Sequence, residues 1–161
     1  MRFSLIDRIV ELEPGRRIVA VKALTLAEEY LKDHFPKFPV MPGVMMLEAL
    51  HQASAWLVRK SEDFAHSVVL LKEAKNVKYS DFVEPGQVLK VTSEIIKEDG
   101  SLVSLKAQGD VDGRTAVMAR LVLDRFNLAD REPARAGLDP YIRRCQIDEF
   151  QLLYHPEPSA G

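Results

Sequence analysis

Residues 44–58 constrain the fold of this 161-residue chain more than any other segment. A helix built from this run is apolar on almost every side, and the first basic pair, Arg59-Lys60, follows its C-terminal end. A helix of this kind cannot lie on a surface, so other structure must enclose it. Pro42 suits the first helical turn, because the N–H that proline lacks has no intrahelical partner there.

Segments rich in Val, Ile, Leu and Thr flank the expected helix on both sides. Before it, residues 4–12 and 17–24 surround a Pro-Gly turn, which predicts a hairpin. After it, turn signals separate the last three of four further runs, residues 67–71, 88–97, 102–111 and 115–123. This order predicts an α+β fold in which one curved antiparallel sheet wraps around one long central helix.

Composition and charge exclude several classes of protein. A hydrophobic content of 47% and a charged content of 29% exclude a disordered or collagen-like chain. The 22 basic and 24 acidic side chains nearly balance, so we expect neither a nucleic-acid nor a membrane partner. Cys145 is the single cysteine, and the N-terminus lacks the apolar run of a signal peptide, so we expect a cytoplasmic location.

The composition changes beyond about Phe126. Residues 1–126 hold the expected helix and strands, whereas residues 127–161 are more charged and are predicted to be a C-terminal extension, partly docked or flexible. Residues 157–161 are expected to fray. Six residues could dock part of this extension: Tyr141, Ile142, Phe150, Leu152, Leu153 and Tyr154.

Glu48 is the anomaly within the apolar helix, because its neighbours are apolar apart from His51 and Gln52. Burial disfavours a charged carboxyl, so Glu48 must be paired, hydrogen-bonded or kept protonated with a raised pKa. One interpretation is structural, with Glu48 bonded to Gln52 one turn on. The other pairs Glu48 with His34 as acid and base, because a stiff segment with three prolines, which favour extended backbone before them, joins His34 to this helix.

Gly43 stands where that segment enters the helix. Backbone N–H groups of a first helical turn have no internal partner, and no side chain at Gly43 blocks a substrate oxygen from approaching. Glu48 lies five residues further, about 7–8 Å deeper. An oxyanion donor, a base and an acid around an apolar channel suit removal of a proton beside a carbonyl with loss of a leaving group from the next carbon.

This segment resembles a known family. The motif reads His34-Phe35-Pro36, then Pro39-Val40-Met41-Pro42-Gly43-Val44, then Glu48-Ala49-Leu50 and Gln52-Ala53. It is similar to that of the FabZ-type 3-hydroxyacyl-ACP dehydratases of the FabA/FabZ family, and Glu rather than Asp at position 48 points to FabZ. The resemblance spans roughly residues 4–125 and includes Leu5-Ile6-Asp7-Arg8 and Val83-Glu84-Pro85-Gly86.

The resemblance implies a hotdog fold and a homodimer or a trimer of dimers, with His34 of one subunit facing Glu48 of the other. It implies that the Gly43 N–H polarises the thioester carbonyl, His34 takes the C2 proton and Glu48 protonates the departing 3-hydroxyl, with Gln52 orienting Glu48. The substrate would be carried on acyl carrier protein, and neither a metal nor an organic cofactor would be needed. An acyl tunnel would be lined by Phe35, Val40, Met41, Val44 and Met45.

Departures from the family pattern keep alternatives open. Asp33 stands where Gly is usual, Lys37 follows His-Phe-Pro where Gly is usual, and His51, which can hydrogen-bond to Glu48, replaces a small or apolar residue. These residues favour a non-catalytic subunit that binds acyl-ACP, whereas a hotdog thioesterase would leave His34 unexplained. A metal site built from His34, Glu48 and His51 has weak support, since a single Glu-x-x-His motif lacks a second carboxylate-bearing helix.

Overall fold

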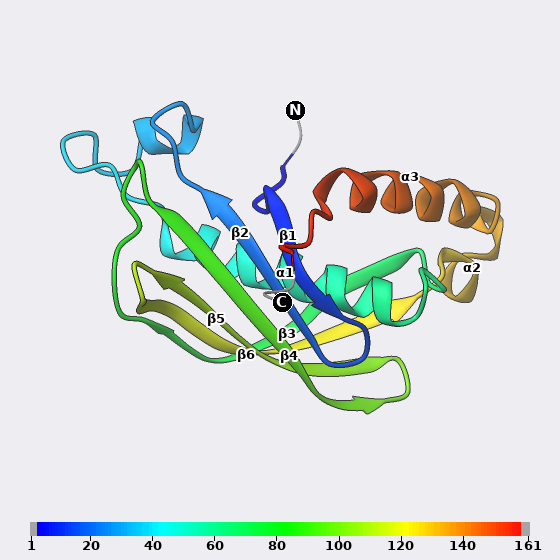
Figure 1. Cartoon of the computed structure of the whole chain (residues 1–161). Coiled ribbons are helices and arrows are strands. Elements are labelled where there is room, and N and C mark those ends of the chain that lie inside the picture. Colours follow the sequence, from blue (N-terminus) through cyan, green and yellow to red (C-terminus); the bar gives the residue numbers. More distant parts are fainter. Residues whose placement is uncertain (1–2, 159–161) are drawn as a thin grey trace.

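A computed structural model describes residues 3–158, in which six strands form one antiparallel sheet curved around a central helix (Figure 1). The strand order is β1-β2-β4-β5-β6-β3. This architecture confirms the predicted α+β hotdog fold. The strands are β1 (Arg8–Glu13), β2 (Arg17–Ala23), β3 (Val68–Tyr79), β4 (Val88–Asp99), β5 (Leu102–Val111) and β6 (Arg114–Phe126); the main helices are α1 (Gly43–Ser61) and α3 (Leu138–Leu153).

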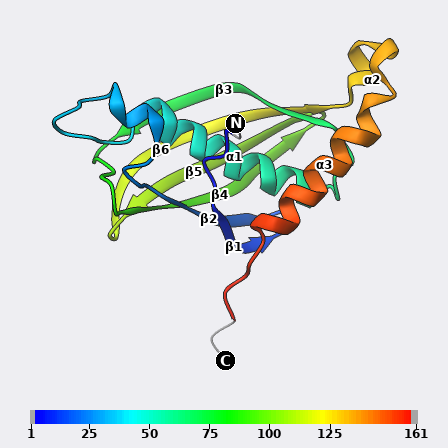
Figure 2. The same ribbon diagram turned by 90° about the horizontal axis from the view of Figure 1, so that it is seen from above.

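The expected hairpin and the expected meander are both present. β1 pairs with β2 around the turn at Gly15, whose φ of 78° suits a residue without a side chain. β2 then pairs with β4 rather than β3, and β3 lies at the far edge beside β6. α1 therefore connects β2, next to one edge strand, with β3 at the opposite edge of the sheet. Figure 2 shows α1 lying within the curve of the strands.

β3 is longer than the sequence pattern indicates. The run of β-forming residues suggested a strand over residues 67–71, whereas β3 continues to Tyr79. Its pairing with β6 shifts register between Lys75 and Lys78, and Asn76 within that shift has a φ of 53°. This bulge breaks the alternation of buried and exposed residues, so the second half of the strand lacks the period-2 pattern.

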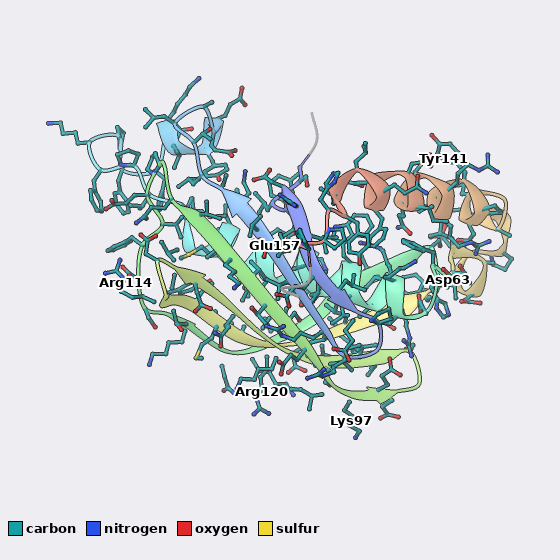
Figure 3. The ribbon with its side chains drawn as sticks, viewed as in Figure 1. Asp63, Lys97, Arg114, Arg120, Tyr141 and Glu157 are labelled. Carbon is teal, nitrogen blue, oxygen red and sulfur yellow. The ribbon has the colours of Figure 1, made fainter. Side chains whose placement is uncertain are left out.

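The enclosure of α1 confirms the expectation from its apolar surface. The buried residues of α1 pack within the curve of the sheet, and Ser54 makes a 2.7 Å hydrogen bond to Ser93 of β4 inside this core. They are Met46, Ala49, Leu50 and the six residues 53–58. The opposite face of the sheet is solvated, and Lys97 and Arg120 extend from it (Figure 3). Within residues 3–158, no helix combines the length and apolarity needed to cross a bilayer.

The C-terminal segment packs back on the core. Two short helical turns, α2 (Leu128–Arg131) and η2 (Pro133–Arg135), lead into α3, which buries Phe150 and Leu153. Tyr141, by contrast, points into solvent (Figure 3), and Leu152 is also exposed. The Glu157 amide donates to the carbonyl of Val10 at 3.0 Å, so the predicted fraying is wrong at this residue; residues 159–161 lie outside the described part.

Candidate active site

His34 lies on the segment between η1 (Glu29–Lys32) and α1, which protrudes from the body of the protein (Figure 1). Its half-buried ring lies 4.4 Å from the ring of Phe35, centroid to centroid. Phe35 precedes a proline, and the expected extended backbone is wrong there, because its φ is 54°. A turn closed by a 2.7 Å hydrogen bond from the Phe38 amide to the Phe35 carbonyl holds this conformation.

The end of the segment is fixed to the sheet. The Met41 amide donates to the carbonyl of Val83 at 2.9 Å, in the connection between β3 and β4. Val40 and Met41 are each 1% exposed, and Met41 belongs to the main hydrophobic core. Of the five residues expected to line a tunnel, these two are thus enclosed within the protomer, whereas Phe35 and Val44 are exposed and Met45 is half-buried.

Gly43 is the first residue of α1, so its N–H has no acceptor within the helix. A Cβ built at this position would lie 3.1 Å from Cε1 of Tyr79, at the end of β3. A side chain would therefore crowd the Tyr79 ring. Ligand access is one reason for glycine at this position, and the close approach of the Tyr79 ring is a second.

Glu48, His51 and Gln52 form a hydrogen-bonded cluster on one side of α1. Nδ1 of His51 lies 3.2 Å from Oε2 of Glu48, and Nε2 of Gln52 donates to Oε1 of Glu48 at 3.1 Å. The Gln52 carbonyl oxygen accepts from the Leu5 amide at 2.8 Å, and its Nε2 also reaches the carbonyl of Phe3 at 3.2 Å. The N-terminal segment thereby fixes Gln52, which in turn contacts Glu48.

The pKa of Glu48 is lowered, which corrects the expectation of a raised value. The hydrogen bond from His51 is the largest cause; burial acts in the opposite direction, while the Gln52 hydrogen bond and the charge of His51 lower the pKa further. The Glu48 side chain keeps 32% of its surface exposed, so burial is partial. Hydrogen-bond donors therefore outweigh desolvation in the single protomer.

Not every expected site residue joins this cluster. Among residues 3–158, no hydrogen bond links His34 to Glu48 within one protomer, and no group of three or more His, Cys, Asp or Glu side chains could hold a metal ion.

An apolar hollow of about 630 Å³ is lined in part by Phe35, whose ring contacts that of His34. Its lining includes Phe35 and Phe38 from the protruding segment and Phe82 from the β3–β4 connection. The rings of Phe38 and Phe82 meet edge to face at 5.8 Å, and all three phenylalanines are about half exposed. Sequence reasoning missed the contribution of Phe82 and Tyr79, although both lie close to the Val83-Glu84-Pro85-Gly86 segment that resembles the family.

Sequence comparison gives one family match and many relatives. The FabA-like domain model matches residues 1–120. A 3-hydroxyacyl-[acyl-carrier-protein] dehydratase FabZ of Anaeromyxobacter sp. (strain Fw109-5) is 41% identical over 134 residues, covering 81% of this chain and 83% of the relative. The enzyme of the same name from Lactiplantibacillus plantarum is 40% identical over 110 residues, covering 68% of this chain and 75% of its own length.

Solved structures with the same fold are more distant in sequence. The dehydratase heterocomplex ApeI:P from Xenorhabdus doucetiae aligns with a TM-score of 0.65 at 18% identity, covering 78% of this chain and 85% of that chain. The protein smu.793 from Streptococcus mutans, solved with acetyl CoA, aligns with a TM-score of 0.62 at 12% identity, covering 79% and 93%. At these identities the likeness extends to the fold alone.

Proposed function

This chain belongs to the FabA-like family, and from that premise we propose how its own residues carry out the reaction. The chain is a 3-hydroxyacyl-[acyl-carrier-protein] dehydratase, a hydro-lyase of fatty-acid biosynthesis that removes water from a 3-hydroxyacyl thioester. The product is the trans-2-enoyl thioester. The observation that carries this conclusion is the match to dehydratases at about 40% identity over most of the chain, and it does not favour a non-catalytic subunit or a thioesterase.

In the proposed mechanism, His34 removes the C2 proton of the substrate and Glu48 protonates the 3-hydroxyl. The C2–H electron pair becomes the second bond between C2 and C3, and the C3–O bond breaks to release water. The Gly43 N–H donates to the thioester oxygen, where negative charge develops as C2 loses its proton. Its position at the start of α1 supports this role, since that N–H has no intrahelical acceptor.

Glu48 must hold a proton when it acts as the acid, although its pKa is lowered in the single protomer. We propose that the partner subunit and the acyl chain cover the exposed third of its side chain. Desolvation then favours the neutral carboxyl and raises the pKa. Gln52 keeps the carboxyl oriented throughout, supported by its own hydrogen bonds to the N-terminal segment.

The proposed active unit is a homodimer in which His34 and Glu48 of each site come from different subunits. A trimer of such dimers would contain the same shared sites. The exposed phenylalanines beside His34 support such an interface, because apolar patches of this kind commonly mark contact sites. We further propose that Phe35, Val44 and Met45 line the acyl tunnel, with Val40 and Met41 behind them. Acyl carrier protein presents the substrate, and the reaction takes place in the cytoplasm.

We also propose that residues 1–126 form the dehydratase domain and residues 127–161 an extension that packs on it. The family model matches residues 1–120, which supports a boundary close to the end of β6. Docking of α3 through Phe150 and Leu153 supports the second part of this division.

The activity is tested by incubating the protein with 3-hydroxyacyl-ACP and following the enoyl product by mass spectrometry. We expect His34→Ala and Glu48→Gln each to lower kcat by about 10²–10⁴-fold, the range for loss of a general base or acid. Glu62→Gln, at the C-terminal end of the same helix, is the matched control and should retain wild-type kcat. Unchanged turnover in both site variants would contradict the mechanism.

Mixing the two inactive variants tests whether the site is shared. If each site takes His34 from one subunit and Glu48 from the other, a mixed dimer regains one intact site of two. Because random exchange places half of the subunit pairs in mixed dimers, about one quarter of wild-type activity should return. A site built within one subunit would give no recovery at all.

A further inference from the structure

The proposed mechanism gives no role to His51, although this polar residue of α1 directly contacts the Glu48 carboxyl. Its Nδ1 lies 3.2 Å from Oε2 and 3.4 Å from Oε1 of Glu48. Only 16% of its side chain is exposed, and its Nε2 is buried without a hydrogen-bond partner among the described residues. Burial of an imidazole costs free energy unless its nitrogens form hydrogen bonds, so the contact with Glu48 offsets part of this desolvation cost.

The contact fixes which nitrogen carries the proton. An ionised carboxylate can only accept hydrogen bonds, so Nδ1 of His51 must be the N–H that donates to Glu48. Gln52 donates to the other carboxylate oxygen at 3.1 Å. Two donors from successive positions of α1 therefore hold Glu48 in one orientation.

We propose that His51 is a positioning residue of the dehydration site, holding the Glu48 carboxyl in one orientation through a hydrogen bond from Nδ1–H. This inference rests on the proposed function, because it concerns the group that delivers the proton to the departing hydroxyl. It gives a role to a residue that departs from the family pattern. Glu48 then depends on His51 for its charge state as well as for its orientation.

The direction of the coupling is defined by the cluster. The hydrogen bond from His51 is the largest influence on the pKa of Glu48 and lowers it, in opposition to burial. Removal of His51 must therefore raise the pKa of Glu48 and leave more of the carboxyl protonated at a given pH. The general acid becomes more often protonated but intrinsically weaker.

Other charged groups near α1 are engaged elsewhere. On β3, Glu73 and Lys75 pair with each other at 3.4 Å, and two turns along α1 the guanidinium of Arg59 lies 4.9 Å from the Trp56 ring centroid. Glu149 of α3 acts on Arg59. Gln52, the second contact of Glu48, is uncharged, as are the N-terminal backbone groups bonded to it. Acidic residues before α1 line a pocket with Met45: Glu28, Glu29 and Asp33.

The chain offers a matched control in a second pair of the same kind. Nδ1 of His66 lies 3.0 Å from Oε2 of Glu62, beyond the C-terminal end of α1. Its substitution removes a His–Glu contact without touching the proposed site. Any effect of His51 that comes from the loss of a histidine–glutamate contact in general should appear equally in His66 variants.

The test follows the Glu48 carboxyl by NMR in the full-length protein with ¹³C-labelled glutamate, with Glu48→Gln used to assign its signal. Three variants are compared: His51→Asn, which keeps a donor near the Nδ1 position, His51→Leu, which removes it, and the control His66→Leu. We expect the Glu48 midpoint to rise in His51→Leu, where the donor is lost, and to rise by less in His51→Asn. His66→Leu should match the wild type.

The kinetic readout uses the pH profile of kcat/KM. The reacting form needs Glu48 protonated and His34 neutral, so one limb of the profile reports the protonation of the Glu48 carboxyl. That limb should move to higher pH in His51→Leu while KM stays within about twofold of the wild type. A Glu48 midpoint in His51→Leu equal to that of the wild type, or an equal shift in His66→Leu, overturns the proposal. If the wild type turned over no substrate, the proposed function would fail, whereas the NMR titration would still decide the role of His51.

Discussion

Truncation of Phe150 tests whether α3 is part of the folded core. Phe150 comes from the C-terminal extension, yet only 6% of it is exposed. Its ring centroid lies 6.1 Å from that of Trp56 on α1, 5.7 Å from that of Phe64 and 5.1 Å from that of Tyr154. The Lys60 ammonium lies 5.5 Å from the same ring. The ring thus joins α3 to the C-terminal half of α1.

The expected cost follows from these contacts. Truncation of a buried Phe to Ala removes about 3–5 kcal/mol, from lost transfer free energy and the cavity left behind. Each aromatic pair contributes about 0.5–1.5 kcal/mol beyond area burial. Phe150 lies at the edge of the core, where α3 can partly collapse onto the vacated space, so we expect about 3 kcal/mol. For a domain of this length that lowers Tm by about 6–12 °C.

Urea and thermal unfolding of Phe150→Ala, at one fixed protein concentration, measure this cost. The concentration is fixed because association stabilises a folded subunit. Leu152→Ala is the control on the same helix, since Leu152 is 61% exposed and its truncation should change stability by less than about 0.5 kcal/mol. Equal midpoints for Phe150→Ala and Leu152→Ala would refute the packing of α3 on the core.

Two further predictions concern Gly43 and Asp139. Gly43→Ala should leave the free energy of unfolding within about 1 kcal/mol, because the helix propensity of Ala offsets the 3.1 Å approach to the half-exposed Tyr79 ring, but it should lower kcat/KM in the dehydratase assay. Burial raises the pKa of Asp139, yet hydrogen bonds from Ser67 and from two backbone amides outweigh it, and the pKa is lowered. A lowered folded-state pKa stabilises the fold above the ordinary pKa of Asp, and this stabilisation is lost as pH falls through the folded-state value. Asp139→Asn should therefore unfold more easily at neutral pH and depend less on pH below it in urea titrations, whereas the exposed control Asp148→Asn should behave as the wild type.

The elements that the sequence predicted well are those with local signals. The β1–β2 hairpin follows from Pro14-Gly15, α1 from a predominantly apolar run, and β5–β6 from Asp112-Gly113. Each signal acts within a few residues, so no knowledge of the remaining chain is needed. The second half of β3 has no such signal, because the bulge at Asn76 interrupts its alternation and its register is defined by β6.

The site shows the same division between local and distant effects. The contact of Glu48 with His51 and Gln52 follows from positions three and four residues apart on a helix. The expectation of a raised Glu48 pKa is wrong, because apolar neighbours in the sequence indicate full burial whereas the side chain keeps about a third of its surface in solvent. The expected extended backbone at Phe35 is also wrong, since the turn to Phe38 outweighs the preference of a residue before proline for extended backbone.

These observations separate the residues that stabilise the protomer from those that serve the reaction. Ala49 and Leu50, on the inner side of α1, are fully buried. The side chain of Glu48, the residue before them, is still 32% exposed. The phenylalanines of the protruding segment remain about half exposed around an apolar hollow, and one of them, Phe35, contacts the His34 ring. Apolar area left in water costs about 25 cal/mol for each Å². Exposed apolar surface beside the proposed base therefore indicates that a ligand or another protein surface covers it. An acyl chain and a second subunit would both supply that cover, and both would also desolvate Glu48. If the proposed dimer forms, its contacts would therefore raise the Glu48 pKa and favour the protonated acid that the proposed mechanism needs.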